Sequence, residues 1–246
     1  MSILYTHRLD FNNPGDIWSG PYHYIHRPGV IMDLFNPIPV SKISTIIVGG
    51  GAILCNSRMI NNLKNLLDTY DYKFKIFWGG GITLSEETTE ILKRFDFVGC
   101  RDYNKGFNFL PCPSIMHPLL RQKNTSNKDF LIIDHWKRVP IEFPKLHTRI
   151  KNRFISVDDI INQISLHNYI ITSSYHAAYW GIVLGKKVIV ITNDNFGKFT
   201  FKQHIPVEQK WEDRLLDLTS LYPNAYEECL NLNKNFLNDL IKYKVL

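Results

Sequence analysis

Residues 169–192 constrain the fold most, because their pattern predicts a strand, a helix and a second strand in immediate succession. The apolar residues 169–171 are followed by three small hydroxyl residues at 172–174, which are typical of a helix N-cap. An apolar helical pattern then ends at Gly185 beside two lysines, as helix C-termini commonly do. Residues 188–191 are apolar and β-branched, as expected for a buried strand. This β-α-β arrangement predicts a parallel sheet.

His176 stands in the first turn of the predicted helix, directly after Ser173, Ser174 and Tyr175. Backbone N–H groups at a helix N-terminus favour anions, and open parallel sheets bind ligands at the carboxyl ends of their strands. His176 is also the one group at this edge whose unperturbed pKa suits proton transfer near neutrality. A histidine at the start of an apolar helix is more often structural, but the two preceding serines favour an acid–base role.

The first half of the chain contains two strand patterns, at 44–48 and 74–78, that each end in three consecutive glycines. A helical pattern follows each of these glycine runs. Glycines allow a ligand to approach the carboxyl ends of parallel strands closely, which favours a ligand-lining role. Tight turns and close packing are an equally weighted explanation for each run taken alone.

Two further segments lie at predicted strand ends. The strand pattern at 2–6 leads into the turn residues 13–16, which could cradle an anion or form an ordinary turn. The strand pattern at 95–99 leads to Arg101. An arginine at this position either forms a structural ion pair, for example with Asp102, or clamps a carboxylate or phosphate group.

Strand and helix patterns alternate through both halves of the chain. Further helical patterns occur at 17–25, 209–219 and 224–243. The alternation predicts an α/β protein with two Rossmann-like domains whose parallel sheets face a cleft, and a single large doubly wound sheet is the main alternative. The polar segment 122–128 is the best linker candidate. We therefore expect domains at 1–122 and 123–246, with the last helix packing back on the N-terminal domain.

The composition excludes several classes of function. The net charge is +6 but dispersed, without a Lys or Arg run, so an anionic ligand is expected and nucleic acid is not. Four cysteines without a CxxC motif indicate a reduced, cytoplasmic protein. No stretch approaches the ~18 apolar residues of a membrane span, so any membrane contact would be peripheral. The sequence carries no signal for the oligomeric state.

Known motifs narrow the chemistry further. The sequence lacks the GxxxxGK[ST] phosphate loop, the GxSxG elbow, the HExxH zinc motif and the GxGxxG dinucleotide fingerprint. His23 and His26 could share one helix face as metal ligands, but no acidic or cysteine residue stands near them in sequence. We therefore expect neither a metal nor a cofactor.

The combination of these segments resembles the polysaccharide pyruvyltransferase family. Three features carry the resemblance: the Asn13-Pro14-Gly15-Asp16 element, the strands that end in Gly-Gly-Gly, and the Ser-x-x-His helix start from Ser173 to His176. Arg101 with Asp102 resembles the arginine-plus-acid position of the family after the last N-terminal strand. The likeness spans most of the chain, and the block around His176 is its most specific part.

The resemblance implies a GT-B-like fold and the transfer of a pyruvyl unit from phosphoenolpyruvate to a sugar, forming a pyruvate ketal. It implies His176 as general acid or base and Arg101 as the clamp for an anionic group. Ser173, Ser174 and Tyr175 would bind phosphate or carboxylate, and Lys198 or Lys202 would supply charge. The acceptor side would be lined by Asn13, Gly15, Asp16, Gly50, Gly51, Gly80 and Gly81. The acceptor would be a saccharide, free or lipid-linked.

Two alternatives remain open. A glycosyltransferase of the same architecture would use a nucleotide-sugar donor, because its C-terminal domain presents a helix N-terminus to a diphosphate. The second alternative is a carbohydrate-binding protein without catalytic activity.

Overall fold

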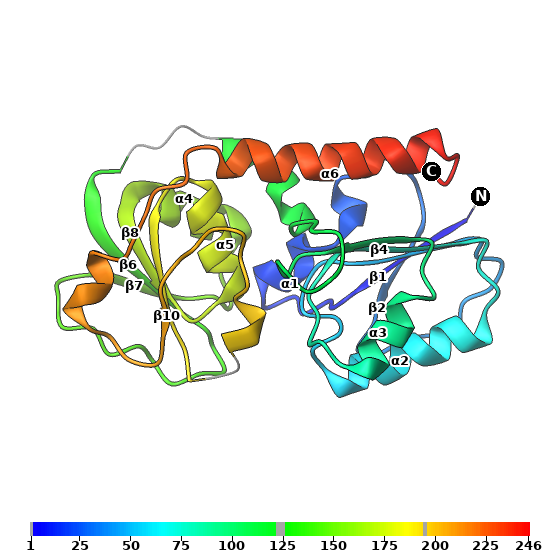
Figure 1. The fold of residues 1–246 in the computed structure, drawn as a ribbon, viewed down its shortest axis with the longest axis horizontal. Coiled ribbons are helices and arrows are strands. Elements are labelled where there is room, and N and C mark those ends of the chain that lie inside the picture. The colour runs from blue at the N-terminus through cyan, green and yellow to red at the C-terminus, as the bar shows by residue number, and fades with distance from the viewer. Residues whose placement is uncertain (1, 122–125, 194–195) are drawn as a thin grey trace. The chain divides into compact units, whose positions relative to one another are not determined.

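The computed structural model describes residues 2–121, 126–193 and 196–246, and the chain divides into two compact units (Figure 1). Unit 1 comprises Met1–Phe11, Asp16–Met116 and Asn231–Leu246, and unit 2 comprises Asn12–Gly15 and His117–Leu230. Each unit contains one five-stranded sheet. The expected boundary between residues 122 and 123 lies outside the described residues, as does most of the expected linker.

The sheet of unit 1 has the strand order β2-β1-β3-β4-β5, and all its neighbouring strands are parallel. Its strands are β1 (Ile3–His7), β2 (Val30–Asp33), β3 (Thr45–Gly49), β4 (Phe74–Gly80) and β5 (Phe97–Cys100). The helices of this part are α1 (Pro14–Trp18), α2 (Ser57–Thr69) and α3 (Glu86–Leu92), with a 3-10 turn at Pro21–His23.

Alternation of side chains along the strands separates two apolar cores in unit 1. Ile46 and Val48 of β3 pack with α2 and α3, whereas Ile47 packs with the end of α6 (Ala225–Lys242) on the opposite face. Figure 1 shows α2 and α3 on one side of this sheet and the second half of α6 on the other. Both faces are therefore covered, as expected for a parallel sheet with continuous apolar strands.

The sheet of unit 2 has the order β10-β9-β8-β6-β7 and is also entirely parallel. Its strands are β6 (Lys128–Asp134), β7 (Thr148–Lys151), β8 (His167–Thr172), β9 (Lys187–Ile191) and β10 (Val207–Glu208). Helices α4 (Val157–Leu166) and α5 (Tyr175–Val183) pack against it. Every residue of α5 is buried, which explains why its sequence is apolar on all sides.

The two sheets share one topology. Counted from the first strand of each unit, the order is second, first, third, fourth, fifth. The chain changes direction between β1 and β3 in unit 1, and between β6 and β8 in unit 2. Ligands of such sheets bind at this switch point, beyond the carboxyl ends of the strands. The prediction of an α/β protein with two Rossmann-like parallel sheets is confirmed, and a single large sheet is wrong.

Several local predictions need correction. The helix expected at 17–25 is replaced by α1 and a 3-10 turn, because Gly20 and Pro21 interrupt it. The helix expected at 209–219 contains only a 3-10 turn at Asp213–Leu216. The strands β2, β7 and β10 are not evident in the sequence, because they are short and partly exposed at or near sheet edges. Among the described residues, no helix has both the length and the apolar character needed to cross a lipid bilayer.

Candidate functional site

In unit 2, the turn from β8 into α5 is held by Thr172. Its hydroxyl donates to the carbonyl of Ile133 at 2.6 Å and accepts from the backbone N–H of Ser174 at 3.0 Å. The first bond ties the end of β8 to β6, and the second bends the chain into α5. The turn between β8 and α5 therefore depends directly on a small hydroxyl side chain at position 172.

The two serines of this turn connect it to neighbouring loops. Ser173 accepts a hydrogen bond from the backbone N–H of His135 at 2.9 Å, and Ser174 accepts from the side-chain amide of Asn152 at 3.2 Å. Both serines are almost fully buried, at 2% and 3% exposure. Ser174 occupies the N-cap of α5 in extended conformation, but its hydroxyl makes no capping hydrogen bond. The expected side-chain cap is therefore absent, and the hydroxyl bonds to a loop instead.

His176 follows this turn and is 7% exposed. Its ring lies against the aromatic rings of Tyr175 and Trp180, with centroids 5.5 and 5.6 Å away. The backbone of Gly15 lies against the other side: a β-carbon built on Gly15 would be 2.7 Å from Cγ of His176 and closer still to Nδ1. Asn13 shapes this approach, because its side-chain oxygen accepts from the N–H of Gly15 at 3.2 Å. Asn13, Gly15 and His176 are thus brought together within unit 2.

The other predicted residues of unit 2 have different surroundings. The ring of Tyr175 stacks on Phe201 at a centroid distance of 4.9 Å, which makes it part of an aromatic core. Lys202 forms an ion pair with Glu228 at 2.8 Å, so its charge is compensated at the surface. The ammonium group of Lys198 lies 5.4 Å from the centroid of the Phe199 ring.

In unit 1, the structure brings Asp16, Gly51, Gly81 and Arg101 together. Gly81 donates its N–H to the carbonyl of Gly51 at 2.7 Å, so the two glycine runs lie side by side. A β-carbon on Gly51 would lie 3.9 Å from a carboxylate oxygen of Asp16, and one on Gly81 would lie 2.7 Å from Nε of Arg101. Gly51 also has a φ of +68°, which disfavours other residues there.

Gly50 and Gly80 are explained by packing. A β-carbon on Gly50 would collide with the carbonyl oxygen of Ser19, and one on Gly80 would collide with the ring of Phe77 in the same strand. Gly50 therefore allows another segment of the chain to approach, and Gly80 leaves room for a neighbouring side chain, so close packing explains both glycines.

Arg101 and its neighbour Asp102 are 2% and 1% exposed. Asp102 accepts a hydrogen bond from the backbone N–H of Ile82 at 2.6 Å, which ties the end of β5 to the loop after β4. Burial raises the pKa of the Cys55 and Cys112 thiols, while the positive charge of Arg101 acts in the opposite direction on both. The guanidinium of Arg101 thus acts on the pKa of both thiols in this part of unit 1.

Two histidines at strand ends are held neutral by burial. His7 ends β1 and is fully buried, which lowers its pKa to about 4. The pKa of His135, directly after β6, is also lowered to about 4, first by burial and then by Arg138 and Lys137. Neither histidine is suited to donate a proton near neutrality, because both are already deprotonated there.

The structure also places His23 and His26, the two residues considered as metal ligands. Within 2–121, 126–193 and 196–246, no group of three His, Cys, Asp or Glu side chains is arranged to hold an ion. The ring of His23 stacks on Trp18 at 4.3 Å, and its Nε2 lies 3.1 Å from the carbonyl oxygen of Ile17. His26 lies beyond the 3-10 turn and is exposed, so the two residues do not share a helix face.

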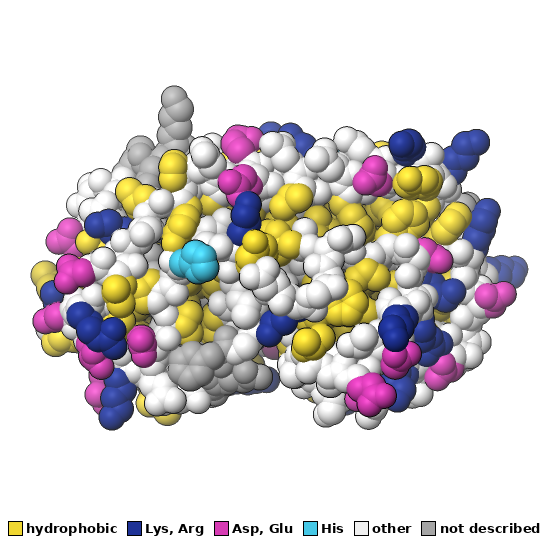
Figure 2. Space-filling view, in the orientation of Figure 1, with side chains coloured by type: hydrophobic (Ala, Val, Ile, Leu, Met, Phe, Trp, Pro, Cys, Tyr) yellow, Lys and Arg dark blue, Asp and Glu magenta, His cyan; other side chains and the backbone are white. Residues whose placement is uncertain are grey.

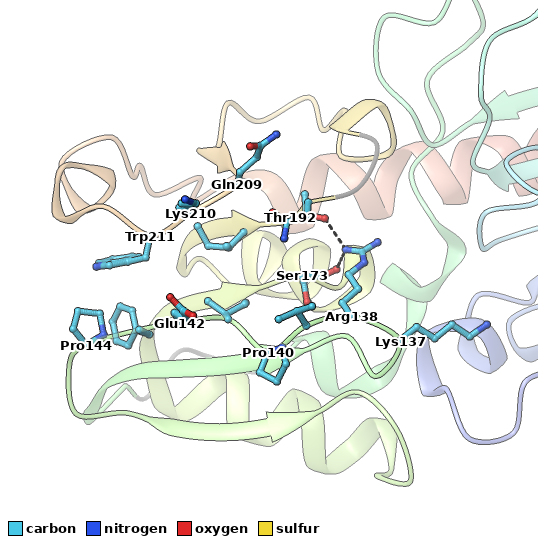
Figure 3. A pocket seen from close by; sticks show the side chains of 15 residues that line it. Lys137, Arg138, Pro140, Glu142, Pro144, Ser173, Thr192, Gln209, Lys210 and Trp211 are labelled. Atoms are coloured by element: carbon cyan, nitrogen blue, oxygen red, sulfur yellow. Dashed lines mark hydrogen bonds between the residues drawn. The ribbon is translucent and has the colours of Figure 1, made fainter.

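A cavity of about 790 Å³ opens at the carboxyl ends of the unit 2 strands (Figure 3). It is lined by Lys137, Arg138, Val139, Pro140, Ile141, Glu142, Phe143, Pro144, Ser173, Ile191, Thr192, Asn193, Gln209, Lys210 and Trp211. These residues follow β6, β8, β9 and β10, so the cavity spans the switch point between β6 and β8. Of the predicted site residues, Ser173 lines it.

Arg138 was missed by the sequence reasoning and marks one end of this cavity. Its Nη1 donates to the backbone carbonyl of Ser173 and, at 3.0 Å, to the hydroxyl of Thr192 (Figure 3). These two bonds fix the guanidinium between the ends of β8 and β9. The only sequence signal was the basic pair of Lys137 and Arg138 shortly after the apolar residues 130–133.

Comparisons with known proteins give the following matches. A model of the polysaccharide pyruvyl transferase family matches residues 5–195, which is more than half of the chain. The crystal structure of a functionally uncharacterized protein from Klebsiella pneumoniae matches with a TM-score of 0.54 and 15% sequence identity, over 81% of this chain and 86% of that one. This likeness concerns the fold alone. No protein with a curated description matches the sequence.

Proposed function

This chain belongs to the polysaccharide pyruvyl transferase family, and from that premise we propose that it transfers a pyruvyl group from phosphoenolpyruvate to a sugar, forming a pyruvate ketal. The acceptor would be a sugar of a polysaccharide or of a glycan precursor. The observation that carries the proposal is the placement of His176 at the start of α5, with its ring held against Gly15.

The chemistry requires a positioned acid and base. A proton is added to the methylene carbon of phosphoenolpyruvate, which leaves a cationic carbon that a sugar hydroxyl attacks. A second hydroxyl of the sugar attacks the same carbon as phosphate departs. Of the two hydroxyl protons released, one replaces the proton added to the methylene carbon and the other leaves with the phosphate as hydrogen phosphate. His176 is proposed to supply the first proton and to recover one from the attacking hydroxyl, since general acid–base catalysis contributes typically about 10²–10⁴-fold in rate.

Each unit is proposed to contain its own residues for binding an anionic group. In unit 2, Ser173, Ser174 and the N-terminus of α5 lie at the carboxyl end of β8, where backbone dipoles favour phosphate or carboxylate. Lys198 is retained as a source of positive charge, whereas the pairing of Lys202 with Glu228 weakens its candidacy. In unit 1, Arg101 is proposed to hold an anionic group, with Asp16, Gly51 and Gly81 beside it on the acceptor side.

Ligand-induced stabilisation tests the donor. A ligand that binds the folded protein raises its melting temperature in proportion to the logarithm of concentration over Kd. We expect phosphoenolpyruvate to stabilise the protein and nucleoside diphosphates to leave the melting temperature unchanged. The reverse result would contradict the proposal and support a glycosyltransferase with a nucleotide-sugar donor.

His176→Ala separates an enzyme from a carbohydrate-binding protein. We expect this variant to lose pyruvyl transfer while phosphoenolpyruvate still raises its melting temperature. If the unaltered protein forms no product with any donor, the hypothesis of a carbohydrate-binding protein without catalytic activity is favoured instead.

A further inference from the structure

The cavity of unit 2 is larger than the proposed donor requires. Its volume of about 790 Å³ lies in the upper part of the range of about 300–1,000 Å³ that is usual for ligands of drug size. Phosphoenolpyruvate is much smaller than such ligands. The cavity therefore has room for a second, larger molecule, and the proposed function assigns no ligand to it.

The charge of the lining favours an anion. Arg138 and Lys210 oppose the single carboxylate of Glu142, and the side chain of Lys137, at the margin of the cavity, points away from it (Figure 3). Residues 137–153 carry six Lys or Arg and one Glu, a net charge of +5 out of +6 for the whole chain. The positive charge is thus less dispersed than the absence of a Lys/Arg run suggested, although Lys145 and Arg149 form ion pairs with Asp213 and Asp134.

On the face shown in Figure 2, basic and acidic side chains are interspersed over both units, and no single large basic patch is visible. A polyanion such as nucleic acid would need an extended basic surface. The few basic side chains that line the cavity instead fit a compact anion.

The anionic group of the ligand belongs at the Arg138 end. The guanidinium of Arg138 is a fork of N–H donors whose geometry matches phosphate, and hydrogen bonds from Nη1 to Ser173 and Thr192 hold it in place. The guanidinium and the hydroxyl of Thr192 together offer a site for phosphate at this end of the cavity, and the N-terminus of α5 is left to the donor.

The opposite end is suited to a polar ring. Figure 3 shows Trp211, Pro144 and Glu142 at the far end of the cavity from Arg138, with Lys210 and Gln209 above them. Trp211 and Phe143 are nearly perpendicular, at 80° with centroids 4.5 Å apart. Perpendicular rings do not form the parallel slot in which a planar base stacks on both faces. The carboxylate, ammonium and amide groups around them match the many hydroxyls of a sugar.

We propose that this cavity binds a glycosyl phosphate, with its phosphate at Arg138 and Thr192 and its sugar ring against Trp211. The proposal rests on the proposed function, because it supplies the saccharide acceptor in the form of a phosphorylated glycan precursor. It extends that function by naming the class of acceptor and the residues that hold it, and it moves the acceptor from Asp16, Gly51 and Gly81 of unit 1 to the cavity of unit 2.

Isothermal titration calorimetry with simple probes tests the proposal. The probes are the 1-phosphates of glucose, galactose, mannose and N-acetylglucosamine, together with inorganic phosphate, methyl glucoside and UDP. We expect at least one hexose 1-phosphate to bind roughly tenfold or more tightly than inorganic phosphate or methyl glucoside, because both ends of the cavity contribute. Equal binding of all of them, or tighter binding of UDP that depends on Arg138 and Trp211, would overturn the proposal.

Variants assign the two ends. Arg138→Gln is expected to weaken hexose 1-phosphate and inorganic phosphate alike, by about tenfold. Trp211→Ala should weaken hexose 1-phosphate by a similar factor and leave inorganic phosphate unchanged. Lys151→Gln is the control, since this exposed lysine of β7 does not line the cavity. Loss of binding in Lys151→Gln, or no loss in Arg138→Gln, would contradict the proposal.

Arg138→Gln also removes hydrogen bonds to Ser173 and Thr192, so its melting temperature must be measured alongside. Arg138→Lys keeps the charge and provides a second variant, which should retain part of the phosphate affinity. Phosphoenolpyruvate titrations separate the two proposals. If hexose 1-phosphate binds but phosphoenolpyruvate does not stabilise the protein, phosphoenolpyruvate is not the donor and the cavity proposal stands. If phosphoenolpyruvate stabilises the protein but no hexose 1-phosphate binds, the cavity proposal is wrong and the proposed donor stands.

Discussion

Gly15 lies so close to His176 that any side chain on Gly15 would displace the imidazole: its β-carbon would be 2.7 Å from Cγ and 3.0 Å from Cβ of the histidine. Gly15 does not have a positive φ, so the glycine is required here by contact and not by backbone conformation. Two segments far apart in sequence thus meet at the proposed acid–base residue.

Gly15→Ala is predicted to reduce pyruvyl transfer strongly while the protein remains folded. Alanine is favourable within α1, so the cost falls on the position of the imidazole. A displacement of about 1 Å can reduce the rate roughly 100-fold. Steady-state kinetics with phosphoenolpyruvate and thermal denaturation measure the two effects separately.

A double-variant cycle with His176→Ala provides the control for Gly15→Ala. In the His176→Ala background, Gly15→Ala should have no further effect on the residual rate, because the contact is already lost. Additive losses would show that Gly15 acts independently of the histidine.

Arg101→Ala is predicted to lower both substrate binding and stability. Arg101 is 2% exposed, so truncation to alanine leaves a cavity in the interior of unit 1. Truncation of a large buried side chain to alanine typically costs about 2–5 kcal/mol in the free energy of unfolding. Urea denaturation measures this loss, and Arg101→Lys should recover part of it.

Arg94→Ala is the matched control for Arg101, because Arg94 pairs with Asp68 at the surface of the same unit. A surface pair contributes ~1 kcal/mol or less, so the stability of Arg94→Ala should change little. If Arg101→Ala leaves anion binding intact and affects stability alone, Arg101 is a structural residue.

The stability of the protein is predicted to fall as pH decreases from about 6.5 to 4. Burial lowers the pKa of His7 to about 4, below its unfolded value, so the unfolded state binds more protons in this window. The contribution of neutral His7 is complete above the unfolded pKa and is lost as pH falls toward the folded one. The shift corresponds to roughly 3 kcal/mol, and the lowered pKa of His135 acts in the same direction.

Urea denaturation at several pH values tests this dependence. His7→Gln should flatten the pH dependence of the free energy of unfolding, whatever its effect at neutral pH. The exposed His26 offers a control, and His26→Gln should retain the slope of the unaltered protein. An unchanged slope in His7→Gln would show that other groups cause the dependence.

Asn233→Ala is predicted to destabilise the protein by about 1–3 kcal/mol, because it leaves the buried indole N–H of Trp78 without its acceptor. Asn233 accepts from Nε1 of Trp78 at 2.8 Å and donates to the carbonyl of Pro111 at 3.1 Å. Thermal or urea denaturation measures the change. Asn235→Ala, at an exposed position of the same helix, should have little effect, and equal losses in both variants would contradict the prediction.

Much of the local architecture could be predicted because its causes are local. Six strand patterns, and the helices after three of them (α2, α3 and α5), were recognisable from apolar periodicity and turn residues. The positions of His176, Arg101 and the glycine runs at strand ends followed from the same patterns. The helix expected at 17–25 is wrong because Gly20 and Pro21 interrupt it, and this cause is also local.

The sequence by itself determined the β-α-β units, the family and the segments that meet at strand ends, because these depend on neighbouring residues. The tertiary structure decided which residues of those segments touch. In the folded protein, Gly15 lies against His176 and Gly81 lies against Arg101. Gly50 and Gly80 serve close packing, and Arg138 and Trp211 line one cavity. Such contacts depend on strand order and burial, which join residues far apart in the chain and leave no local pattern.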